Sequence, residues 1–229
     1  MAATISVIIP TLNEAERIVS AIAQVKSADV AEVIVVDGGS SDDTVAIARS
    51  AAVKVFVCEA NRGKQQNLGA LNASGDVLLF LHADTELPSD FVDVIRQTLA
   101  GRGIVAGAFR FCLDGTGWQL SLVERVVALR CKLLQLPYGD QAIFVAKDVF
   151  ERAGRFPESP AMEDFDLIVR LKKLGRVAIA DAAAITSARR WRQIGIWRMT
   201  WINQLCIFGY YLGIPRQRIA RWREPGRLG

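Results

Sequence analysis

The residues best placed for chemistry are His82 and Asp84, which directly follow an apolar run at positions 77–81. A buried strand that ends in a carboxylate is how an open α/β sheet builds a ligand site at the carboxyl ends of its strands. Two residues separated by one, here Ala83, face the same side of a strand. His82, the only histidine of the chain, and Asp84 could therefore point together into one crevice.

Further polar residues follow two other expected strands. Thr11 and Glu14 come after the apolar segment 4–10, and Asp37 comes after the segment 32–36. If these strands are parallel neighbours, their following residues meet along one edge of the sheet. Each residue also has a structural explanation, because Asp37 precedes two glycines of a turn and Glu14 suits the start of a helix. Their convergence on one edge favours a binding site.

A second group of chemical side chains consists of Glu163, Asp164 and Asp166, which open an amphipathic segment at 163–174. Carboxylates at this position stabilise a helix through its dipole, but one or two of them would be enough. A carboxylate near a phosphate-binding edge is also a natural general base for a hydroxyl nucleophile. We favour the functional interpretation of this cluster.

A third group is the basic run around Arg189 and Arg190, with Trp191 beside them. Arginine matches diphosphate oxygens with two parallel hydrogen bonds and keeps its charge. A solvated surface run explains the same residues equally well, so the sequence leaves both interpretations open.

Alternating strands and helices are expected to position these groups. The pattern predicts an α/β fold with a mostly parallel, doubly wound sheet flanked by helices. The expected strands are 4–10, 32–36, 53–57, 77–81, 104–111, 142–145 and 177–180. The expected helices begin near Asn13 and at Ser41, which is the expected N-cap, and continue with 63–73, 89–99, 118–136, 163–174 and 193–212. We expect a catalytic domain at 1–190 and, at 191–229, an apolar helix and a basic tail packed on it.

Composition narrows the class of protein. A net charge of +4 is too small to indicate a nucleic-acid-binding protein. The four cysteines show no CxxC pair, and their apolar surroundings predict reduced thiols in a cytoplasmic protein. We expect neither a signal peptide nor a membrane-spanning segment. The end of the chain is basic, with nine arginines after position 188 and one acid, Glu224. This charge suits phosphate-bearing ligands or an anionic membrane face, and a C-terminus that only aids solubility explains it equally well.

Several motifs together resemble the GT-A-type, family 2 glycosyltransferases, over about residues 4–175. The matching pieces are SVIIPTLNE at 6–14, VIVVDGGSSDDT at 33–44, NLGA at 67–70, Gly75-Asp76, Ala83-Asp84 and Met162-Glu163-Asp164. The extended His-Ala-Asp-Thr and Ser-Ala-Arg-Arg-Trp pieces resemble a compact bacterial subgroup, sometimes labelled selenium-domain-associated transferases.

The resemblance implies roles for individual residues. Asp164, with Glu163 beside it, would be the catalytic base, Asp37 would accept a hydrogen bond from the base of the nucleotide, expected to be uracil, and Asp84 would bind a divalent cation on the diphosphate. The nucleotide-sugar site would further include Pro10, Thr11, Glu14, Gly63, Lys64, Asn67, His82, Ala83, Arg189, Arg190 and Trp191.

The chain departs from the family at one metal ligand. His82 stands where the family's Asp-x-Asp motif has its first acid. Magnesium prefers oxygen ligands, whereas manganese accepts imidazole more readily. The expected cofactor is therefore Mn²⁺ or Mg²⁺, with Asp84 as a ligand and His82 as a ligand, a sugar contact or a residue that only shapes the pocket.

The predicted activity is inverting, metal-assisted transfer of a sugar from a nucleotide diphosphate sugar to an acceptor hydroxyl. The alternatives are a sugar-nucleotide-binding pseudoenzyme and a nucleotidyltransferase. The second would normally have a glycine-rich loop after the first strand, where this chain has Pro10-Thr11-Leu12-Asn13-Glu14. The apolar segments 118–136 and 194–214 leave open a soluble or a lipid-linked acceptor, packing on the catalytic domain, a homodimer, or peripheral contact with the inner face of the membrane.

Overall fold

The computed structural model describes residues 2–26 and 28–223 and contains one eight-stranded sheet in the order β3-β2-β1-β4-β7-β6-β8-β5. The strands are β1 (Ile5–Thr11), β2 (Glu32–Asp37), β3 (Lys54–Val57), β4 (Val77–Phe80), β5 (Thr85–Glu86), β6 (Ile104–Leu113), β7 (Phe144–Ala146) and β8 (Arg176–Thr186). Strands β1 to β4 are parallel, as are β6 and β8, whereas β7 runs antiparallel to both of its neighbours and β5 runs antiparallel to β8. The predicted fold class is confirmed.

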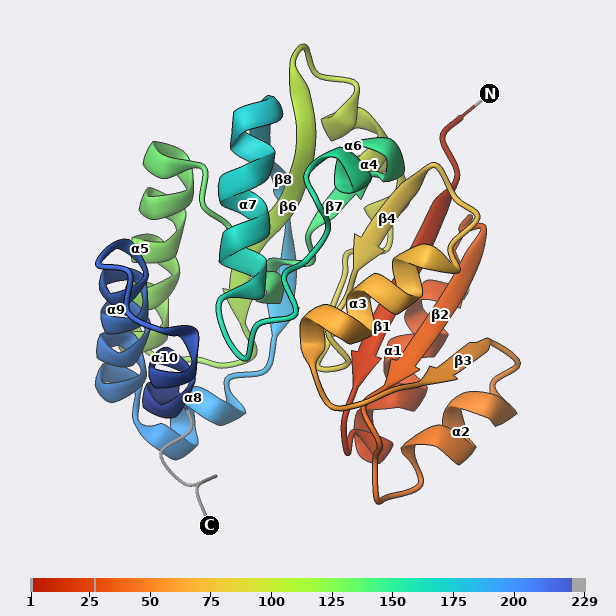
Figure 1. Ribbon diagram of the computed structural model, residues 1–229, viewed down its shortest axis with the longest axis horizontal. Coiled ribbons are helices and arrows are strands. Elements are labelled where there is room, and N and C mark those ends of the chain that lie inside the picture. Colours follow the sequence, from red (N-terminus) through yellow and green to blue (C-terminus); the bar gives the residue numbers. More distant parts are fainter. Residues whose placement is uncertain (1, 27, 224–229) are drawn as a thin grey trace.

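Helices cover both faces of this sheet, and the last three lie together at the end far from the N-terminus (Figure 1). They are α1 (Ala15–Lys26), α2 (Thr44–Ser50), α3 (Arg62–Leu71), α4 (Phe91–Leu99), α5 (Trp118–Leu134), α6 (Lys147–Arg152), α7 (Glu163–Leu174), α8 (Arg189–Ile194), α9 (Ile196–Tyr211) and α10 (Arg216–Arg223), with a 3-10 turn at Gly139–Gln141. Within the described ranges, no helix is both long enough and apolar enough to cross a lipid bilayer.

Strand β1 shows how the sheet separates two cores. Ile5, Val7 and Ile9 belong to the core with α1 and α4, whereas Ile8 belongs to the core with α3 and α7, and all four are fully buried. This alternation follows from the two-residue period of a strand. Helix α3 lies very close to β1, because a Cβ atom on Gly69 would lie only 2.5 Å from Cγ2 of Ile8. A larger residue at position 69 would push the helix off the sheet.

The structure differs from the predicted elements in the C-terminal half. Strand β8 continues to Thr186 instead of ending at position 180, and α6 and α10 were not predicted. In the N-terminal half, β5 was not predicted either. The predicted helix 193–212 is two helices, because the chain breaks at Gly195, whose φ of 93° favours glycine. Helix α8 spans the expected 190/191 boundary, so the division into 1–190 and 191–229 stays a prediction. Glu224 and Arg227 of the basic tail lie outside the described residues.

The start of α2 is also different from the expected one. The helix begins at Thr44 and its N-cap position is Asp43, so the prediction of Ser41 as N-cap is wrong. Ser41 instead uses its backbone N–H and its hydroxyl to donate to Oδ1 of Asn13, at 2.9 and 3.3 Å. These bonds join the loop after β2 to the loop after β1.

Candidate active site

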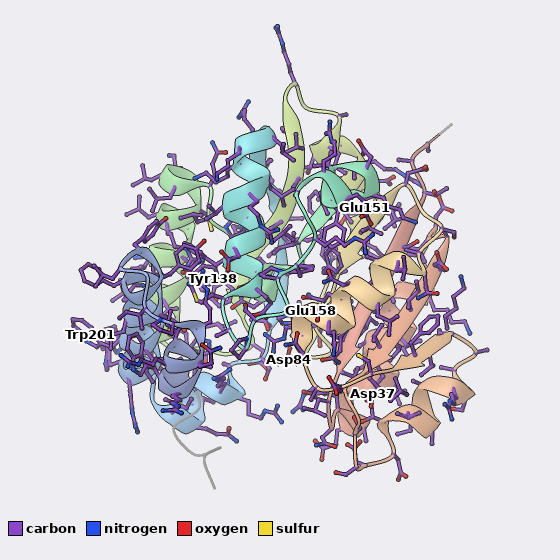
Figure 2. The ribbon with its side chains drawn as sticks, in the orientation of Figure 1. Asp37, Asp84, Tyr138, Glu151, Glu158 and Trp201 are labelled. Atoms are coloured by element: carbon purple, nitrogen blue, oxygen red, sulfur yellow. The ribbon has the colours of Figure 1, made fainter. Side chains whose placement is uncertain are left out.

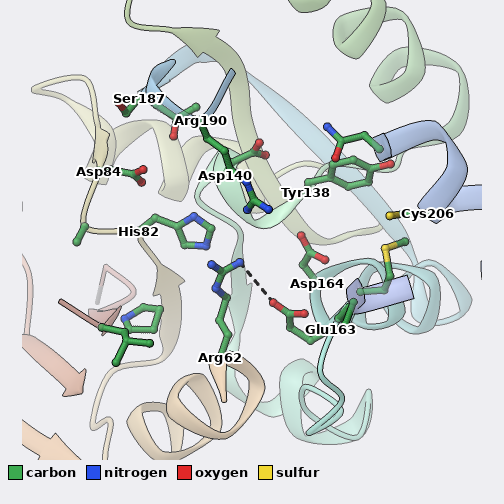
Figure 3. Close-up of a pocket in the computed structure, with 18 of the residues that line it drawn as sticks. Arg62, His82, Asp84, Tyr138, Asp140, Glu163, Asp164, Ser187, Arg190 and Cys206 are labelled. Atoms are coloured by element: carbon green, nitrogen blue, oxygen red, sulfur yellow. Dashed lines mark ion pairs between the residues drawn. The ribbon is translucent and has the colours of Figure 1, made fainter. Parts of the chain in front are cut away.

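A cavity of about 900 Å³ lies between the carboxyl ends of β1 and β4 and the helices α7 to α10. Most of the predicted site residues line it, namely Pro10, Thr11, Glu14, His82, Ala83, Asp84, Glu163, Asp164, Arg189, Arg190 and Trp191. Figure 3 shows four labelled residues around this one space: His82 and Asp84 from the loop after β4, Asp164 from α7 and Arg190 from α8. Of the residues expected to meet along the sheet edge, Thr11, Glu14, His82 and Asp84 line this cavity, whereas Asp37 does not.

The short strand β5 brings the loop that contains Asp84 close to the segment that contains the arginines. Thr85 is paired with Thr186 at the end of β8, and their hydroxyl oxygens are 3.1 Å apart. One step further, the N–H of Ser187 donates to the carbonyl oxygen of Asp84 at 3.1 Å. Because Arg189 and Arg190 come shortly after Ser187, this pairing brings the two arginines to the same cavity as Asp84. Cationic groups next to a carboxylate suit a ligand that carries both a diphosphate and a bound cation.

The carboxylates that open α7 have three different partners. Glu163, only 4% exposed, forms an ion pair with Arg62 at 3.6 Å (Figure 3). Asp164 accepts a hydrogen bond from the N–H of Gly139 through Oδ2 at 2.7 Å. Asp164 is thus the member of the cluster whose carboxylate is held at the cavity by a backbone group and not by a neighbouring charge.

The third carboxylate, Asp166, connects α7 to the C-terminal helices. It forms an ion pair with Arg216 of α10 at 3.0 Å and accepts a hydrogen bond from the hydroxyl of Tyr210 of α9. Burial and this hydrogen bond raise the pKa of Tyr210 to about 12. The acid cluster therefore divides into one ion pair at the cavity, one candidate base and one structural anchor.

His82 and Asp164 approach one another across Gly139. A Cβ atom on this glycine would lie 3.2 Å from Nε2 of His82 and 3.3 Å from Oδ2 of Asp164. The imidazole, the carboxylate and the backbone of the 3-10 turn therefore pack tightly at one point of the cavity wall. Only a residue without a side chain leaves both groups where they are.

We therefore expect Gly139→Ala to lower the turnover number by about tenfold to a hundredfold without unfolding the protein. The added methyl group would displace Asp164 or His82 by a few tenths of an ångström, and small misplacements of reacting groups are costly. Steady-state kinetics together with a thermal melt would measure this. An unchanged turnover number would show that the exact placement of these two groups has no catalytic importance.

Asp37 lies beneath the cavity and does not line it. Its side chain is fully buried and accepts hydrogen bonds from the N–H groups of Gly39 and Ser40 at 2.8 and 2.7 Å. The hydroxyl of Thr11 also donates to it, at 3.0 Å. Beside it, Nε2 of Gln65 bridges the carbonyl oxygens of Thr11 and Val36, at 2.8 Å each. These bonds tie the ends of β1 and β2 together, and recognition of uracil by Asp37 stays a prediction.

Three residues predicted for the nucleotide-sugar site do not line the cavity and make contacts elsewhere in the protein. Asn67 exchanges hydrogen bonds with the backbone of Phe156, at 2.9 and 3.0 Å, and a Cβ atom on Gly63 would lie 2.4 Å from the carbonyl oxygen of Pro157. Lys64 forms an ion pair with Glu59 at 2.7 Å. The first two contacts fasten α3 to the segment that leads into Glu163 and Asp164.

The sequence analysis did not identify four of the cavity residues: Arg62, Gln65, Tyr138 and Asp140. Two signals were available. Gln65 and its neighbour Gln66 are polar residues on a helix face that packs on the sheet, which is unusual for a purely structural helix. Tyr138 and Asp140 lie in a Tyr-Gly-Asp-Gln segment that follows a long helix, in a loop of the kind that often carries function.

Asp84 and His82 are the residues that could hold a divalent cation. Within residues 2–26 and 28–223, no group of three or more His, Cys, Asp or Glu side chains is arranged to hold a metal ion. The loop after β4 therefore offers two protein ligands, one carboxylate oxygen and one imidazole nitrogen. This number fits a cation that takes its other ligands from phosphate groups and water, as Mg²⁺ commonly does, and the imidazole suits Mn²⁺.

Comparison with known families identifies the class of protein. Residues 6–143, more than half of the chain, match glycosyl transferase family 2. The chain belongs to this family. The matched region includes the ends of β1, β2 and β4, so family 2 membership covers the half of the cavity that contains Asp84.

Individual relatives agree with this assignment. Glycosyltransferase AglE of Haloferax volcanii is 29% identical over 170 residues, which cover 67% of this chain and 56% of the relative. A glycosyltransferase of Rickettsia felis is 42% identical over 97 residues, 42% of this chain and 34% of that protein. The chain spans about half the length of the curated relatives it matches, between 34% and 56%.

Solved structures show the same GT-A fold. A mannosyltransferase of Pyrobaculum calidifontis, PcManGT, in complex with GDP-Man and Mn²⁺, aligns with a TM-score of 0.70 at 21% identity, covering 90% of this chain and 63% of that one. Glucosyl-3-phosphoglycerate synthase from Mycobacterium tuberculosis, in complex with Mn²⁺, UDP-glucose and phosphoglyceric acid, aligns with a TM-score of 0.65 at 20% identity, covering 93% and 81%.

Proposed function

We propose that this family 2 protein transfers a sugar from a nucleotide diphosphate sugar, with UDP as the expected nucleotide, to an acceptor hydroxyl with inversion at the anomeric carbon. The observation that carries the proposal is the meeting of Asp84, Arg190 and Asp164 around one cavity. A diphosphate site and a carboxylate base at opposite sides of a cavity are the two parts that such a transfer needs. The complexes of PcManGT with GDP-Man and of the mycobacterial synthase with UDP-glucose support a nucleotide-sugar donor.

The diphosphate would lie against Arg189 and Arg190, with Asp84 and His82 holding a Mn²⁺ or Mg²⁺ ion on its oxygens. Such a cation neutralises the charge of a leaving diphosphate. The two guanidinium groups add positive charge at the same place, and they keep it at any physiological pH. Mn²⁺ in both structural relatives supports this arrangement.

The acceptor would enter from the side of α7. Asp164 would take the proton from its hydroxyl while that oxygen attacks the anomeric carbon from the face opposite the leaving diphosphate, which inverts the configuration. Hydrogen bonds from the N–H of Gly139 to Oδ2 and from the N–H of Phe165 to Oδ1, both 2.7 Å, would hold the carboxylate of Asp164 in place for this step.

Isothermal titration of UDP and of GDP into the purified protein, with and without Mn²⁺, tests the donor site. We expect UDP to bind, and to bind at least about tenfold more tightly when Mn²⁺ is present, because a cation held by Asp84 would neutralise charge on the diphosphate. Preference for GDP would keep the class of reaction and change the donor. Failure of both nucleotides to bind, with or without metal, would contradict the proposed donor site.

A further inference from the structure

Helices α5 and α9 expose a continuous set of large apolar side chains, which we call the α5–α9 apolar face. Its members are Trp118, Leu122, Val126, Leu129 and Leu133 on α5, and Trp197, Trp201, Leu205, Phe208 and Leu212 along α9. Each of these side chains is between 40% and 69% exposed. The spacing is four, four, three and four residues on both helices, so each set forms one stripe along its helix.

The two stripes adjoin. The rings of Trp118 and Trp197 are 5.9 Å apart, and the helices lie side by side at one end of the molecule (Figure 1). Trp201 projects outward, away from the body of the protein (Figure 2). Cys131 on α5 and Cys206 on α9 are buried on the opposite sides of these helices. Each helix therefore packs on the protein through one apolar side and exposes a second apolar side. An exposed apolar surface of this extent marks an interaction site.

The charges around this face indicate its partner. From Arg189 to Arg223 the chain contains no Asp or Glu and eight arginines, at 189, 190, 192, 198, 216, 218, 221 and 223. Arg198 lies next to the stripe of α9, and Arg125 and Lys132 lie along the stripe of α5, all three exposed. A second copy of this chain would bring arginines against arginines, which is unfavourable at an interface. An anionic lipid surface has the complementary charge.

The aromatic residues fit the same partner. Trp118, Trp197 and Trp201 are exposed on the α5–α9 apolar face, and tryptophan is enriched where proteins meet the headgroup region of a bilayer. An apolar helix face bordered by cationic residues lies in the plane of that region without crossing it. We propose that the α5–α9 apolar face docks the protein on anionic lipid bilayers.

Docking would bring the cavity close to the lipid surface. The opposite side of α9 lines the cavity through Met199, Asn203 and Cys206, so only the thickness of one helix, about 10 Å, separates the exposed stripe from the site. A hydroxyl on a lipid headgroup is the acceptor that this arrangement would serve, and this last step rests on the proposed function, whereas docking itself does not.

Co-sedimentation of the purified protein with vesicles tests docking without any need for activity. One set of vesicles contains phosphatidylcholine alone and the other equal parts of phosphatidylcholine and phosphatidylglycerol. We expect binding to the anionic set, and at least a tenfold loss of binding in the double variant Trp201→Ser, Phe208→Ser. The matched control is Val57→Ser with Leu71→Ser, which removes two apolar side chains, 51% and 60% exposed, from another part of the surface and should bind like the unchanged protein.

A second double variant and a fluorescence measurement test the same proposal independently. Arg198→Gln with Arg125→Gln leaves the apolar face intact and should weaken binding to anionic vesicles only. Brominated lipids should quench the tryptophan fluorescence of the unchanged protein, and less so after Trp201→Phe. The proposal is overturned if the unchanged protein stays in solution with anionic vesicles, or if Trp201→Ser, Phe208→Ser binds equally well. A dimer that dissociates in that variant, without vesicle binding by the unchanged protein, would assign the face to a second copy.

Discussion

Asp164→Asn is expected to lower the turnover number by about 10²- to 10⁴-fold, the usual contribution of a general base, and to leave the affinity for the nucleotide unchanged. An amide has nearly the same shape, and its oxygen can still accept the hydrogen bond that the N–H of Gly139 donates to Oδ2. What it loses is the ability to take a proton from the acceptor hydroxyl. Steady-state kinetics and calorimetric titration of the same preparation would separate the two effects.

Asp148→Asn on α6 is the matched control for this variant. It makes the same chemical change at a side chain that is 74% exposed and pairs loosely with Arg152, 3.8 Å away. The control should keep full activity. Full turnover by Asp164→Asn with its true acceptor would show that another group accepts the proton. Glu163, which forms an ion pair with Arg62, would be the next candidate to test.

The second large effect is expected at Asp84. Asp84→Asn should abolish the gain in nucleotide affinity that Mn²⁺ provides and lower transfer by more than about a hundredfold, because a neutral amide is a weaker ligand for a hard cation than a carboxylate. Affinity measured without metal should change little. Calorimetry of the nucleotide across a series of Mn²⁺ concentrations would give both quantities.

Two companion variants make the result specific. Glu86→Gln removes an exposed carboxylate two residues further along and should behave like the unchanged protein. His82→Gln distinguishes a metal ligand from a residue that shapes the pocket, because only the first role changes the Mn²⁺ concentration at half-saturation. If Asp84→Asn keeps the metal dependence of the unchanged protein, the cation binds at other residues or takes no part in nucleotide binding.

Much of the N-terminal half could be predicted from the sequence. Strands β1, β2 and β4 are largely apolar segments, and polar residues lie at or shortly after their ends. The sequence therefore predicted both the strands and the gathering of polar residues at one edge of the sheet. The same reasoning located His82, Asp84 and Asp164, because residues at strand ends and at helix starts occupy predictable positions. The amphipathic pattern of α7 gave its limits correctly.

Other elements depend on tertiary contacts that have no local signature. Strand β5 has only two residues and exists because Thr85 pairs with Thr186, more than a hundred positions away. The basic sequence of helix α10 is typical of a solvated tail. In the structure, the ion pair between Arg216 and Asp166 holds this helix to α7. The break at Gly195 interrupts a segment whose composition alone suggested one helix.

The binding residues show the same limit. The family resemblance implied that Asp37 and Asn67 lie near the nucleotide. It could not show that Asp37 is already surrounded by protein donors or that Asn67 holds the backbone of Phe156. Polar residues near a site are often part of its framework. Arg62 was missed because nothing in its local sequence distinguishes a cavity arginine from a surface one.

Asp166 connects the C-terminal helices to the helical turn that carries the candidate base Asp164. The carboxylate holds Tyr210 and Arg216 of the C-terminal helices, and it belongs to the same helical turn as Asp164. In the proposed docked state, a shift of α9 would therefore reach the candidate base Asp164 through a single residue. Such a protein is suited to interfacial activation, in which attachment adjusts turnover, so that the donor is consumed where the acceptor is found and spared in free solution.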